Sequence, residues 1–397
     1  MSTGILIFFR RGDRVGTEIV TDTLTITVTD VVTVTMTVTY NWLMDRFSVF
    51  APAKVNLHLA VKNKRPDGFQ NLESVFLAVN FGDDLSFSSV PNNSVSGGSS
   101  SVPNGGDCFS MEFENAAEVS SSVPAENVCS IPNNIILRAL SLFREKTGFK
   151  QNLSINVVKR IPIGGGLGGG SSDAAATLLA LNKIAGSPLG TELLLEMGAV
   201  LGSDVPFFLR QIPAAMVTGR GECIEPIEAP QMFLVLVNPG FPSDTGTAFK
   251  LLDENRRSQE SHSEDCLTTR ERSGARRRVT VREPFFIQNN FNFKLCNLDN
   301  HEIYKKTSNG NSASANCSPT RFCESSFYND FLPVFDDRVK TIYYRIISML
   351  TELGAQYANL SGSGSTCFGV FENEERAQKA AEVLQNDWSF VRMTSTL

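Results

Sequence analysis

The sequence predicts an α+β protein with two domains, and three observations lead to this prediction. The 397 residues are enough for two domains, each with its own hydrophobic core. From about residue 47, segments alternate apolar and polar residues as half-buried strands do, and helical segments follow them. The chain closes on a strand, a helix and a strand in turn, which is typical of a compact β-α-β unit.

Residues 1–43 differ from the rest of the chain. Between positions 20 and 40 they are almost entirely Thr and Val, a low-complexity pattern with strong β propensity. We expect this extension to lie outside the fold and the working protein to start at Met44. The extension is a poor transit peptide because Asp13, Glu18, Asp22 and Asp30 make it acidic.

The predicted N-terminal domain spans residues 44–230. Its expected strands are 55–61, 72–79, 85–87 and 153–158, and its expected helices are 134–147, about 172–185 and 191–201. Residues 91–126 are rich in Ser, Gly, Asn and Pro, which indicates a solvated insertion.

The predicted C-terminal domain spans residues 231–397. We expect strands at 233–237, 366–371 and 388–393, and helices at about 337–353 and 374–384. Polar insertions are expected at about 254–283 and 305–325. The first carries charges of both signs without interleaved aromatic residues, which favours a solvated loop over a nucleic-acid-binding patch.

Charge and composition exclude some classes of partner. The formal net charge is −6, so no overall positive field indicates binding to nucleic acid or to an anionic membrane. No apolar run is long enough for a membrane span. The eight cysteines show no metal-ligand spacing, and we expect them to be reduced in a cytoplasmic protein. The expected partner is a small molecule; the oligomeric state is not predicted.

Residues 162–172 form a glycine-rich loop with six glycines in the seven positions 164 to 170. In a purely structural turn so many glycines would cost conformational entropy without any gain. Beside a ligand, they let successive backbone N–H groups come close. The helix that follows adds the positive end of its dipole, and Ser171 and Ser172 add hydroxyl groups. The loop therefore predicts a polyphosphate-binding site.

Other interpretations of this loop are weaker. Gly164, Gly166 and Gly169 match the dinucleotide-binding fingerprint, but the upstream sequence does not indicate the doubly wound domain that this fingerprint requires. A Walker loop is excluded because no Gly-Lys-Ser/Thr follows the glycines. A second loop of Gly and Ser, at 360–365, is either a plain turn or the other wall of the same phosphate site.

Two charged residues are chemical candidates. Asp204 follows a predicted helix and precedes Phe207 and Phe208, a setting that suits a rigid proton acceptor or a cap of the next element. Lys54 lies on a predicted strand, where it either faces solvent or offsets the negative charge of a transferred phosphoryl group.

Three separated segments together resemble the motifs of the GHMP kinases: 51–57 (Ala-Pro-Ala-Lys-Val-Asn-Leu), 162–172 and 360–365. Within that family, 65–69 (Arg-Pro-Asp-Gly-Phe) and 202–208 are similar to segments of the members that phosphorylate a cytidine-diphospho sugar alcohol of non-mevalonate isoprenoid biosynthesis. The resemblance covers most of 47–397.

The resemblance implies the GHMP kinase fold, with a β-rich N-terminal α/β domain that binds ATP and a ferredoxin-like C-terminal α/β domain. It implies phosphorylation of the 2-hydroxyl of 4-diphosphocytidyl-2-C-methyl-D-erythritol by ATP. Mg²⁺ is expected with ATP; its protein ligands are not predicted, and Ser171 and Ser172 are candidates. Lys54 and Asp204 match the catalytic pair, and Asn56, Phe69 and Gln70 match the positions that meet the substrate. The residues expected at ATP are Pro162, Ile163, Gly164, Gly165, Gly166, Leu167, Gly168, Gly169, Gly170, Ser171, Ser172 and Asn134.

Two residues depart from the family pattern. Gln70 stands where histidine is usual, and Asp173 stands where asparagine is common. Glutamine can still donate and accept hydrogen bonds to a pyrimidine. The alternatives that stay open are a GHMP kinase for homoserine or mevalonate, a non-catalytic nucleotide-binding relative and, from another class, a dinucleotide-dependent oxidoreductase. A plastid location is an alternative to the cytoplasm if the host is a plant or alga.

Overall fold

The computed structural model describes residues 20–29, 32–40, 46–65, 68, 70–90, 107–114, 134–270 and 327–397. The chain divides into two compact units, Met1–Phe47 and Ser48–Leu397. In the first unit, β1 (Val20–Thr29) and β2 (Val32–Tyr40) form an antiparallel hairpin in which Val20 lies opposite Tyr40. The domain boundaries expected at residues 43 and 230 stay predictions.

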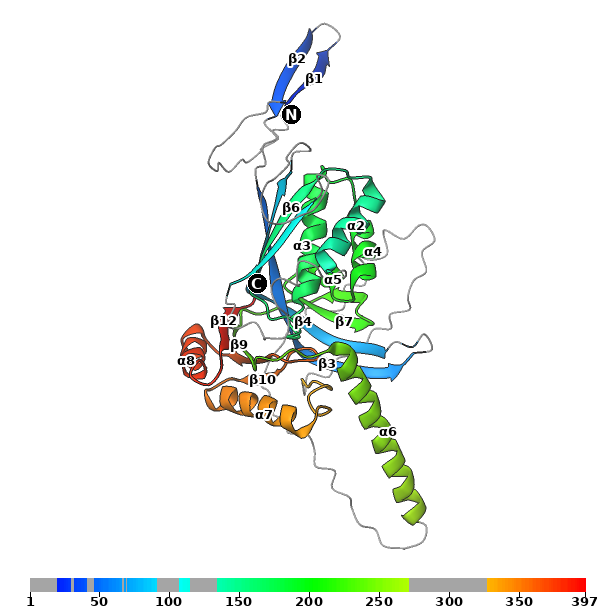
Figure 1. The fold of residues 1–397 in the computed structure, drawn as a ribbon, viewed down its shortest axis with the longest axis vertical. Coiled ribbons are helices and arrows are strands. Elements are labelled where there is room, and N and C mark those ends of the chain that lie inside the picture. Colours follow the sequence, from blue (N-terminus) through cyan, green and yellow to red (C-terminus); the bar gives the residue numbers. More distant parts are fainter. Residues whose placement is uncertain are drawn as a thin grey trace. The chain divides into compact units, whose positions relative to one another are not determined.

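The first part of the second unit is built on a six-stranded sheet (Figure 1). The strand order is β5-β6-β4-β7-β8, with β3 paired to β4. The β5–β6 pair is parallel, whereas the β4–β6, β4–β7 and β7–β8 pairs are antiparallel. The strands are β3 (Phe47–Lys64), β4 (Gln70–Ser89), β5 (Cys108–Phe113), β6 (Leu153–Lys159), β7 (Ala214–Gly219) and β8 (Cys223–Pro226).

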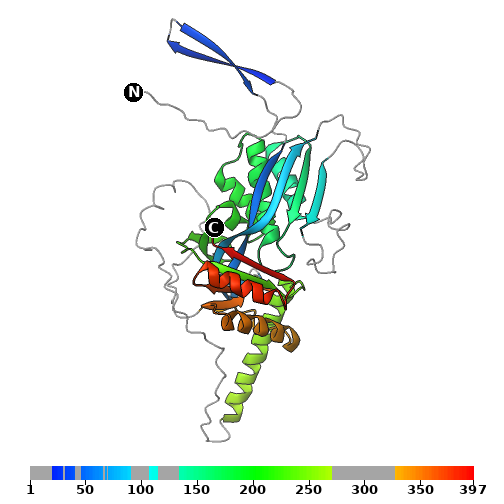
Figure 2. The same cartoon turned by 90° about the vertical axis from the view of Figure 1, so that its left-hand side faces the viewer.

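Helices cover one face of this sheet, as the green ribbons in Figure 2 show. They are α2 (Ile135–Thr147), α3 (Gly169–Ile184), α4 (Thr191–Leu201) and α5 (Val205–Leu209). The central helix α3 contacts α2, α4 and α5 and is buried along most of its length. Alanines at 174–176 and 180 allow this close packing because they need little space and favour helix.

The second part is a four-stranded antiparallel sheet with the strand order β10-β11-β9-β12. Its elements are β9 (Phe233–Asn238), α6 (Thr245–Arg270), α7 (Asp337–Glu352), β10 (Tyr357–Leu360), β11 (Cys367–Phe371), α8 (Glu374–Leu384) and β12 (Phe390–Ser395). A β-α-β-β-α-β succession with this strand order is ferredoxin-like. The fold expected for the C-terminal half is therefore confirmed.

The two sheets share a hydrophobic core. Along β9, Val235 and Val237 pack in one cluster with residues of α7 and α8, while Leu234 and Leu236 pack in another with residues of β3 and β4. This follows from the alternation of side chains along a strand. Because β9 is buried on both faces, the two sheets are fixed relative to each other. The loops at their junction are fixed with them.

Several elements differ from the sequence-based expectations. β5 lies inside the segment 91–126, which was expected to be a solvated insertion, and α6 continues through 254–270, which was expected to be loop. Phe249 and Leu252 anchor the first turns of α6 in the core, and the helix-favouring residues that follow extend it. The strands expected at 72–79 and 85–87 are one strand, β4, while β7, β8, β10 and α5 were not predicted.

Two further findings concern composition. Cys108 and Cys367 are free thiols, whereas Cys223 is disulfide-bonded, so the expectation of reduced cysteines is wrong for Cys223. Among the described residues, no helix has both the length and the apolar character needed to cross a membrane.

Candidate active site

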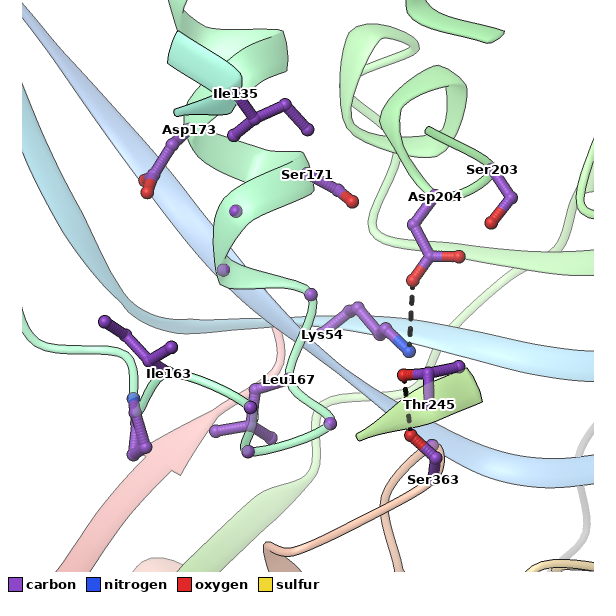
Figure 3. Close-up of a pocket in the computed structure, with 18 of the residues that line it drawn as sticks. Lys54, Ile135, Ile163, Leu167, Ser171, Asp173, Ser203, Asp204, Thr245 and Ser363 are labelled. Carbon is purple, nitrogen blue, oxygen red and sulfur yellow. Dashed lines mark hydrogen bonds and ion pairs between the residues drawn. The ribbon is translucent and has the colours of Figure 1, made fainter. Parts of the chain in front are cut away.

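A cavity of about 570 Å³ lies where β3, the glycine-rich loop, the start of α3 and the loop 360–365 meet (Figure 3). Most residues predicted for the site line it: Lys54, Asn56, Asn134, Asp204 and all of 162–171. Ser172 does not; it is buried and lines a separate cavity of about 340 Å³. Gln70 lines an adjoining cavity, and Phe69 lies outside the described residues.

Lys54 and Asp204 face each other across this cavity (Figure 3). The Lys54 Nζ atom lies 3.4 Å from Asp204 Oδ2 and 4.6 Å from the centre of the Phe76 ring. Lys54 is 5% exposed, whereas Asp204 is 27% exposed and so remains accessible to a ligand. Asp204 directly precedes α5 but makes no capping hydrogen bond. Of the two alternatives for Asp204, the structure therefore favours a chemical role over a cap.

Asn56 fixes the position of Lys54. Lys54 Nζ donates a hydrogen bond to Asn56 Oδ1 at 2.5 Å, and Asn56 Nδ2 donates to Ser74 Oγ at 2.8 Å. The backbone N–H of Asn56 donates to Ser361 Oγ at 3.3 Å, and this hydroxyl in turn donates to Gly166 O at 3.0 Å. The lysine is thus held on a strand that is tied to both glycine loops.

The carbonyl groups of the glycine-rich loop are bound to neighbouring backbone. Leu167 O accepts from the N–H of Lys54 at 2.9 Å, and Gly165 O accepts from that of Thr366 at 3.1 Å. Because the C=O and N–H of a trans peptide point in opposite directions, these bonds turn the N–H groups of Gly166 and Gly168 away from the strands that hold the carbonyls. The loop is therefore a fixed backbone with directed N–H donors.

Gly166 explains why the loop cannot carry side chains at its tightest point. Its φ is +75°, and a Cβ atom there would lie 2.1 Å from Ser361 O and 2.7 Å from Gly364 O. The loop 360–365 therefore packs directly against the glycine-rich loop, as expected if the two form opposite walls of one site. Asn329 supports this second loop, since its Nδ2 donates to Leu360 O and Gly362 O, both at 2.8 Å.

A buried cluster of charges lies beneath the start of α3. Lys159 Nζ donates to Asp83 Oδ2 and, at 2.8 Å, to Asp173 Oδ2. Asp83 Oδ1 also accepts from the N–H groups of Arg160 and Ile161. All three side chains of the cluster are buried, and both Lys159 and Asp173 line the cavity. Only the extra charge of Asp173 was noted from the sequence. Asp83 and Asp173 are 76 and 14 positions away from Lys159 in the sequence.

Burial raises the pKa of Asp173 from 3.8 to about 7, with the neighbouring charge of Asp83 adding to the rise and Lys159 opposing it. For Lys159, burial lowers the pKa, but Asp173 and Asp83 outweigh this effect and the net pKa is raised. The cluster therefore keeps its lysine charged, while Asp173 exchanges a proton near neutral pH.

A second cavity, of about 530 Å³, adjoins the first. Leu72, Ser203 and Phe249 line both cavities, and Ser203 is the neighbour of Asp204. Polar and charged side chains line the rest of the second cavity: Lys64, Gln70, Arg220, Glu222, Lys250 and Asp253. A long acceptor molecule could therefore lie in the second cavity and present its reacting group to Asp204.

Two further residues have structural roles. Asn134 caps α2, since its Oδ1 accepts from the N–H of Ile136 at 2.9 Å, and it also lines the first cavity. His58 is buried, accepts from the N–H of Tyr328 through Nδ1, and has a pKa lowered to about 4 by burial. It lines none of these cavities, so we assign it to packing.

Thr245, which lines the site and contacts Ser363 Oγ at 2.9 Å, was not identified from the sequence.

Comparison with known families gives two matches within this chain. The GHMP kinases N terminal domain matches residues 134–211, and the GHMP kinases C terminal domain matches residues 325–389. The first contains the glycine-rich loop and Asp204, and the second contains the loop 360–365.

Individual relatives extend these matches over most of the chain. The 4-diphosphocytidyl-2-C-methyl-D-erythritol kinase of Thermodesulfovibrio yellowstonii is 30% identical over 349 residues, covering 86% of this chain and 95% of the relative. The chloroplastic kinase of the same name from Oryza sativa subsp. japonica is 36% identical over 217 residues, covering 54% of this chain and 48% of the relative.

Solved structures agree with this pattern. A crystal structure of 4-(cytidine 5'-diphospho)-2C-methyl-D-erythritol kinase is 25% identical, covers 88% of this chain and 98% of its own, and has a TM-score of 0.56. Homoserine kinase from Cytophaga hutchinsonii, at 14% identity and a TM-score of 0.50, shares the fold alone.

Proposed function

The chain belongs to the GHMP kinases, in the family of 4-diphosphocytidyl-2-C-methyl-D-erythritol kinases, and we propose that its two adjoining cavities bind ATP and this substrate for the family's reaction. The reaction is the ATP-dependent phosphorylation of the substrate's 2-hydroxyl in non-mevalonate isoprenoid precursor biosynthesis. The observation that carries the proposal is the Lys54–Asp204 pair, 3.4 Å apart, beside the glycine-rich loop in one cavity.

ATP binds through its phosphates to the glycine-rich loop and the start of α3. The residues assigned to it are 162–171 and Asn134, all of which line the first cavity. Backbone N–H groups and the positive end of the α3 dipole are suited to a polyphosphate. Ser172 was expected in this set, but its burial outside the first cavity favours a packing role for it.

Asp204 and Lys54 carry out the chemistry. Asp204 accepts the proton of the substrate's 2-hydroxyl as the oxygen attacks the γ-phosphorus atom. The positive charge of Lys54 lies beside the transferring group and offsets its negative charge. Since Asn56 and the Phe76 ring hold Lys54, little rearrangement is needed during the reaction.

Mg²⁺ is expected together with ATP, and the residues of the cavity fit it. Mg²⁺ prefers oxygen ligands and is usually held by few protein groups together with substrate phosphates. The hydroxyl of Ser171 lines the cavity at the start of α3 and would serve as such a ligand. When bound, the ion would neutralise charge on the phosphates.

The second cavity suits the cytidine-diphospho part of the substrate. It adds about 530 Å³ next to the catalytic pair, which small acceptors such as homoserine or mevalonate would not need. Gln70 lines it, and Lys64, Arg220 and Lys250 bring positive charge for a diphosphate. Asn56 and Phe69 keep their proposed substrate contacts, and Phe69 lies outside the described residues.

The decisive experiment measures ADP release by the purified full chain with ATP and Mg²⁺. The acceptors are 4-diphosphocytidyl-2-C-methyl-D-erythritol, homoserine and mevalonate. We expect ADP release only with the first. Release with homoserine or mevalonate instead would assign the chain to another GHMP activity, and ATP binding without turnover of any acceptor would indicate a non-catalytic relative.

The compartment belongs to the same proposal. We assign the protein to the cytoplasm, with the plastid as the alternative in a plant or alga. The plant relatives from Oryza sativa and Mentha piperita are named as chloroplastic, which favours the alternative only for such a host.

A further inference from the structure

The side-chain amide of Gln70 has one satisfied end and one unsatisfied end. Its Nε2 atom donates to Asp253 Oδ1 at 2.6 Å. Its Oε1 atom is buried and has no hydrogen-bond partner in the described part of the chain. Burying an acceptor without a partner is unfavourable, so such an atom in a ligand cavity indicates a hydrogen-bond donor supplied by the ligand.

Asp253 determines which end of the amide is left without a partner. A carboxylate can only accept hydrogen bonds, so it takes the NH₂ end of the glutamine and leaves the oxygen for the ligand. This assignment does not depend on distinguishing nitrogen from oxygen in the coordinates, because the reversed amide would place two acceptors 2.6 Å apart.

Asp253 is itself held in place. Its Oδ2 atom lies 3.8 Å from Lys64 Nζ. One helical turn farther along α6, Arg256 donates to Val61 O at 2.5 Å and to Lys62 O at 3.3 Å, which ties the helix to β3. Asp253 therefore presents its carboxylate to Gln70 from a fixed helix.

The unpaired acceptor of Gln70 distinguishes the two common pyrimidines. Cytosine carries an amino donor at N4, where uracil carries the acceptor O4. A freely rotating glutamine amide could serve both bases by turning over, since one end accepts and the other donates. A glutamine locked with Oε1 toward the ligand matches cytosine and opposes uracil.

We propose that Asp253 is a specificity-determining residue that locks the Gln70 amide so that Oε1 accepts a hydrogen bond from the N4 amino group of cytosine. Asp253 acts through Gln70 and does not touch the base. This inference rests on the proposed function, because it requires the nucleotide end of the acceptor to lie in the second cavity.

The test compares the binding of CDP and UDP to the full chain by isothermal titration calorimetry. The wild type is expected to bind CDP about tenfold or more tightly than UDP, the discrimination typical of a matched donor and acceptor pair. Asp253→Asn keeps the shape but can either accept from or donate to Gln70, so the lock is lost. The CDP preference is then expected to fall about tenfold, mainly through tighter UDP binding.

Two controls make this result specific. Glu225→Gln removes an exposed negative charge on β8, outside the lining of both cavities, and its CDP-to-UDP ratio is expected to stay within about twofold of wild type. In a Gln70→Met background, Asp253→Asn is expected to have no effect on the ratio, because the amide through which it acts is gone.

The outcomes separate the inference from the function. An unchanged ratio in Asp253→Asn, or equal binding of CDP and UDP by the wild type, overturns the inference even if the wild type turns over the cytidine substrate. Absence of CDP binding overturns the inference. Absence of ADP release with the cytidine substrate, in a protein whose CDP preference still responds to Asp253→Asn, overturns the proposed activity and leaves the base recognition standing.

Discussion

At the residue scale, the site depends on side chains whose neighbours leave them little freedom. Lys54 is buried, hydrogen-bonded to Asn56 and packed on Phe76, with its charge directed at Asp204. Fixing a long side chain costs conformational entropy, and here folding has already met that cost. The relative position of the two side chains is therefore already set in the folded chain.

Asp204→Asn is expected to lower kcat by about 10²- to 10⁴-fold, because the amide cannot accept the hydroxyl proton. ATP affinity should change little, since the glycine-rich loop is untouched. Turnover is measured by ADP release and ATP affinity by calorimetry. Asp387→Asn, which removes a surface aspartate paired with Arg345, serves as the control. Near-normal turnover of Asp204→Asn would exclude the aspartate as the base.

Asp173→Asn is expected to change the pH dependence of stability. The folded-state pKa of Asp173, about 7, lies above its ordinary value of 3.8, so the folded protein holds a proton that the unfolded chain releases. Its contribution to stability is complete below about pH 4 and is lost as the pH rises through 7.

Asparagine carries no charge at any of these pH values. The difference in unfolding midpoint between Asp173→Asn and wild type should therefore grow in favour of the variant from about pH 4 to 7, the range between the two pKa values, and level off above it. Thermal unfolding of both proteins at several pH values measures this difference in midpoint. A difference that does not vary with pH would contradict the raised pKa.

At the scale of elements, two loops from different sheets are in direct contact and both line the first cavity. The N–H of Thr366 and the hydroxyl of Ser361 both bond to carbonyls of the glycine-rich loop. Neither loop could hold this shape alone, because each uses the other as its hydrogen-bond partner.

Gly166→Ala is expected to disrupt this contact, because its Cβ would meet Ser361 O at 2.1 Å in a backbone conformation with φ of +75°. We expect a loss of stability of about 1–3 kcal/mol and weaker ATP binding. Gly170→Ala, at a position inside α3, is the matched control. The added Cβ would meet only Ile135 Cγ2, at 3.7 Å. The unfolding midpoint of this control should equal or exceed that of wild type, since alanine favours helix. Equal stability of the two variants would contradict this account.

The buried cluster links the ends of β4 and β6 to α3, and Asp83 is its most connected member. Asp83→Asn leaves Lys159 with one carboxylate fewer in a buried site, so we expect a loss of about 3–5 kcal/mol of stability. Asp84→Asn is a control on the adjacent residue, whose side chain is 50% exposed and paired with Arg160. It should cost less than about 1 kcal/mol. Chemical denaturation of both variants measures the contrast, and similar losses would show that burial is not the cause.

At the scale of the whole molecule, every residue that lines the two cavities belongs to the unit Ser48–Leu397. The shared core between the sheets lies in the same unit. The site therefore depends on the packing of two sheets within that unit.

Removal of residues 1–43 is accordingly expected to leave ADP release within about twofold and the unfolding midpoint within about 2 °C of the full chain. Both chains are purified in parallel and compared under identical conditions. A large loss of turnover or stability would show that the extension is part of the working fold.

Local patterns were sufficient for much of this structure. The helices α4 and α8 were predicted with their exact bounds, since apolar spacing and flanking stop signals specify helices locally. The glycine-rich loop was also evident from consecutive residues, and its role as a phosphate site stays a prediction. The weakly patterned strands β5 and β8 and the short helix α5 were not predicted, because tertiary packing stabilises them.

By itself, the sequence determined the α+β class, the glycine-rich loop and the kinase motifs, since each is written in consecutive residues with their own periodicity and backbone preference. Only the tertiary structure decided that Lys54 meets Asp204, that Lys159 is buried with Asp83 and Asp173, and that Gln70 is turned by Asp253. These contacts join residues that are 14 to 183 positions apart in the sequence and that come from different parts of the fold. Their distances follow from how the sheets and helices pack, which no local pattern encodes.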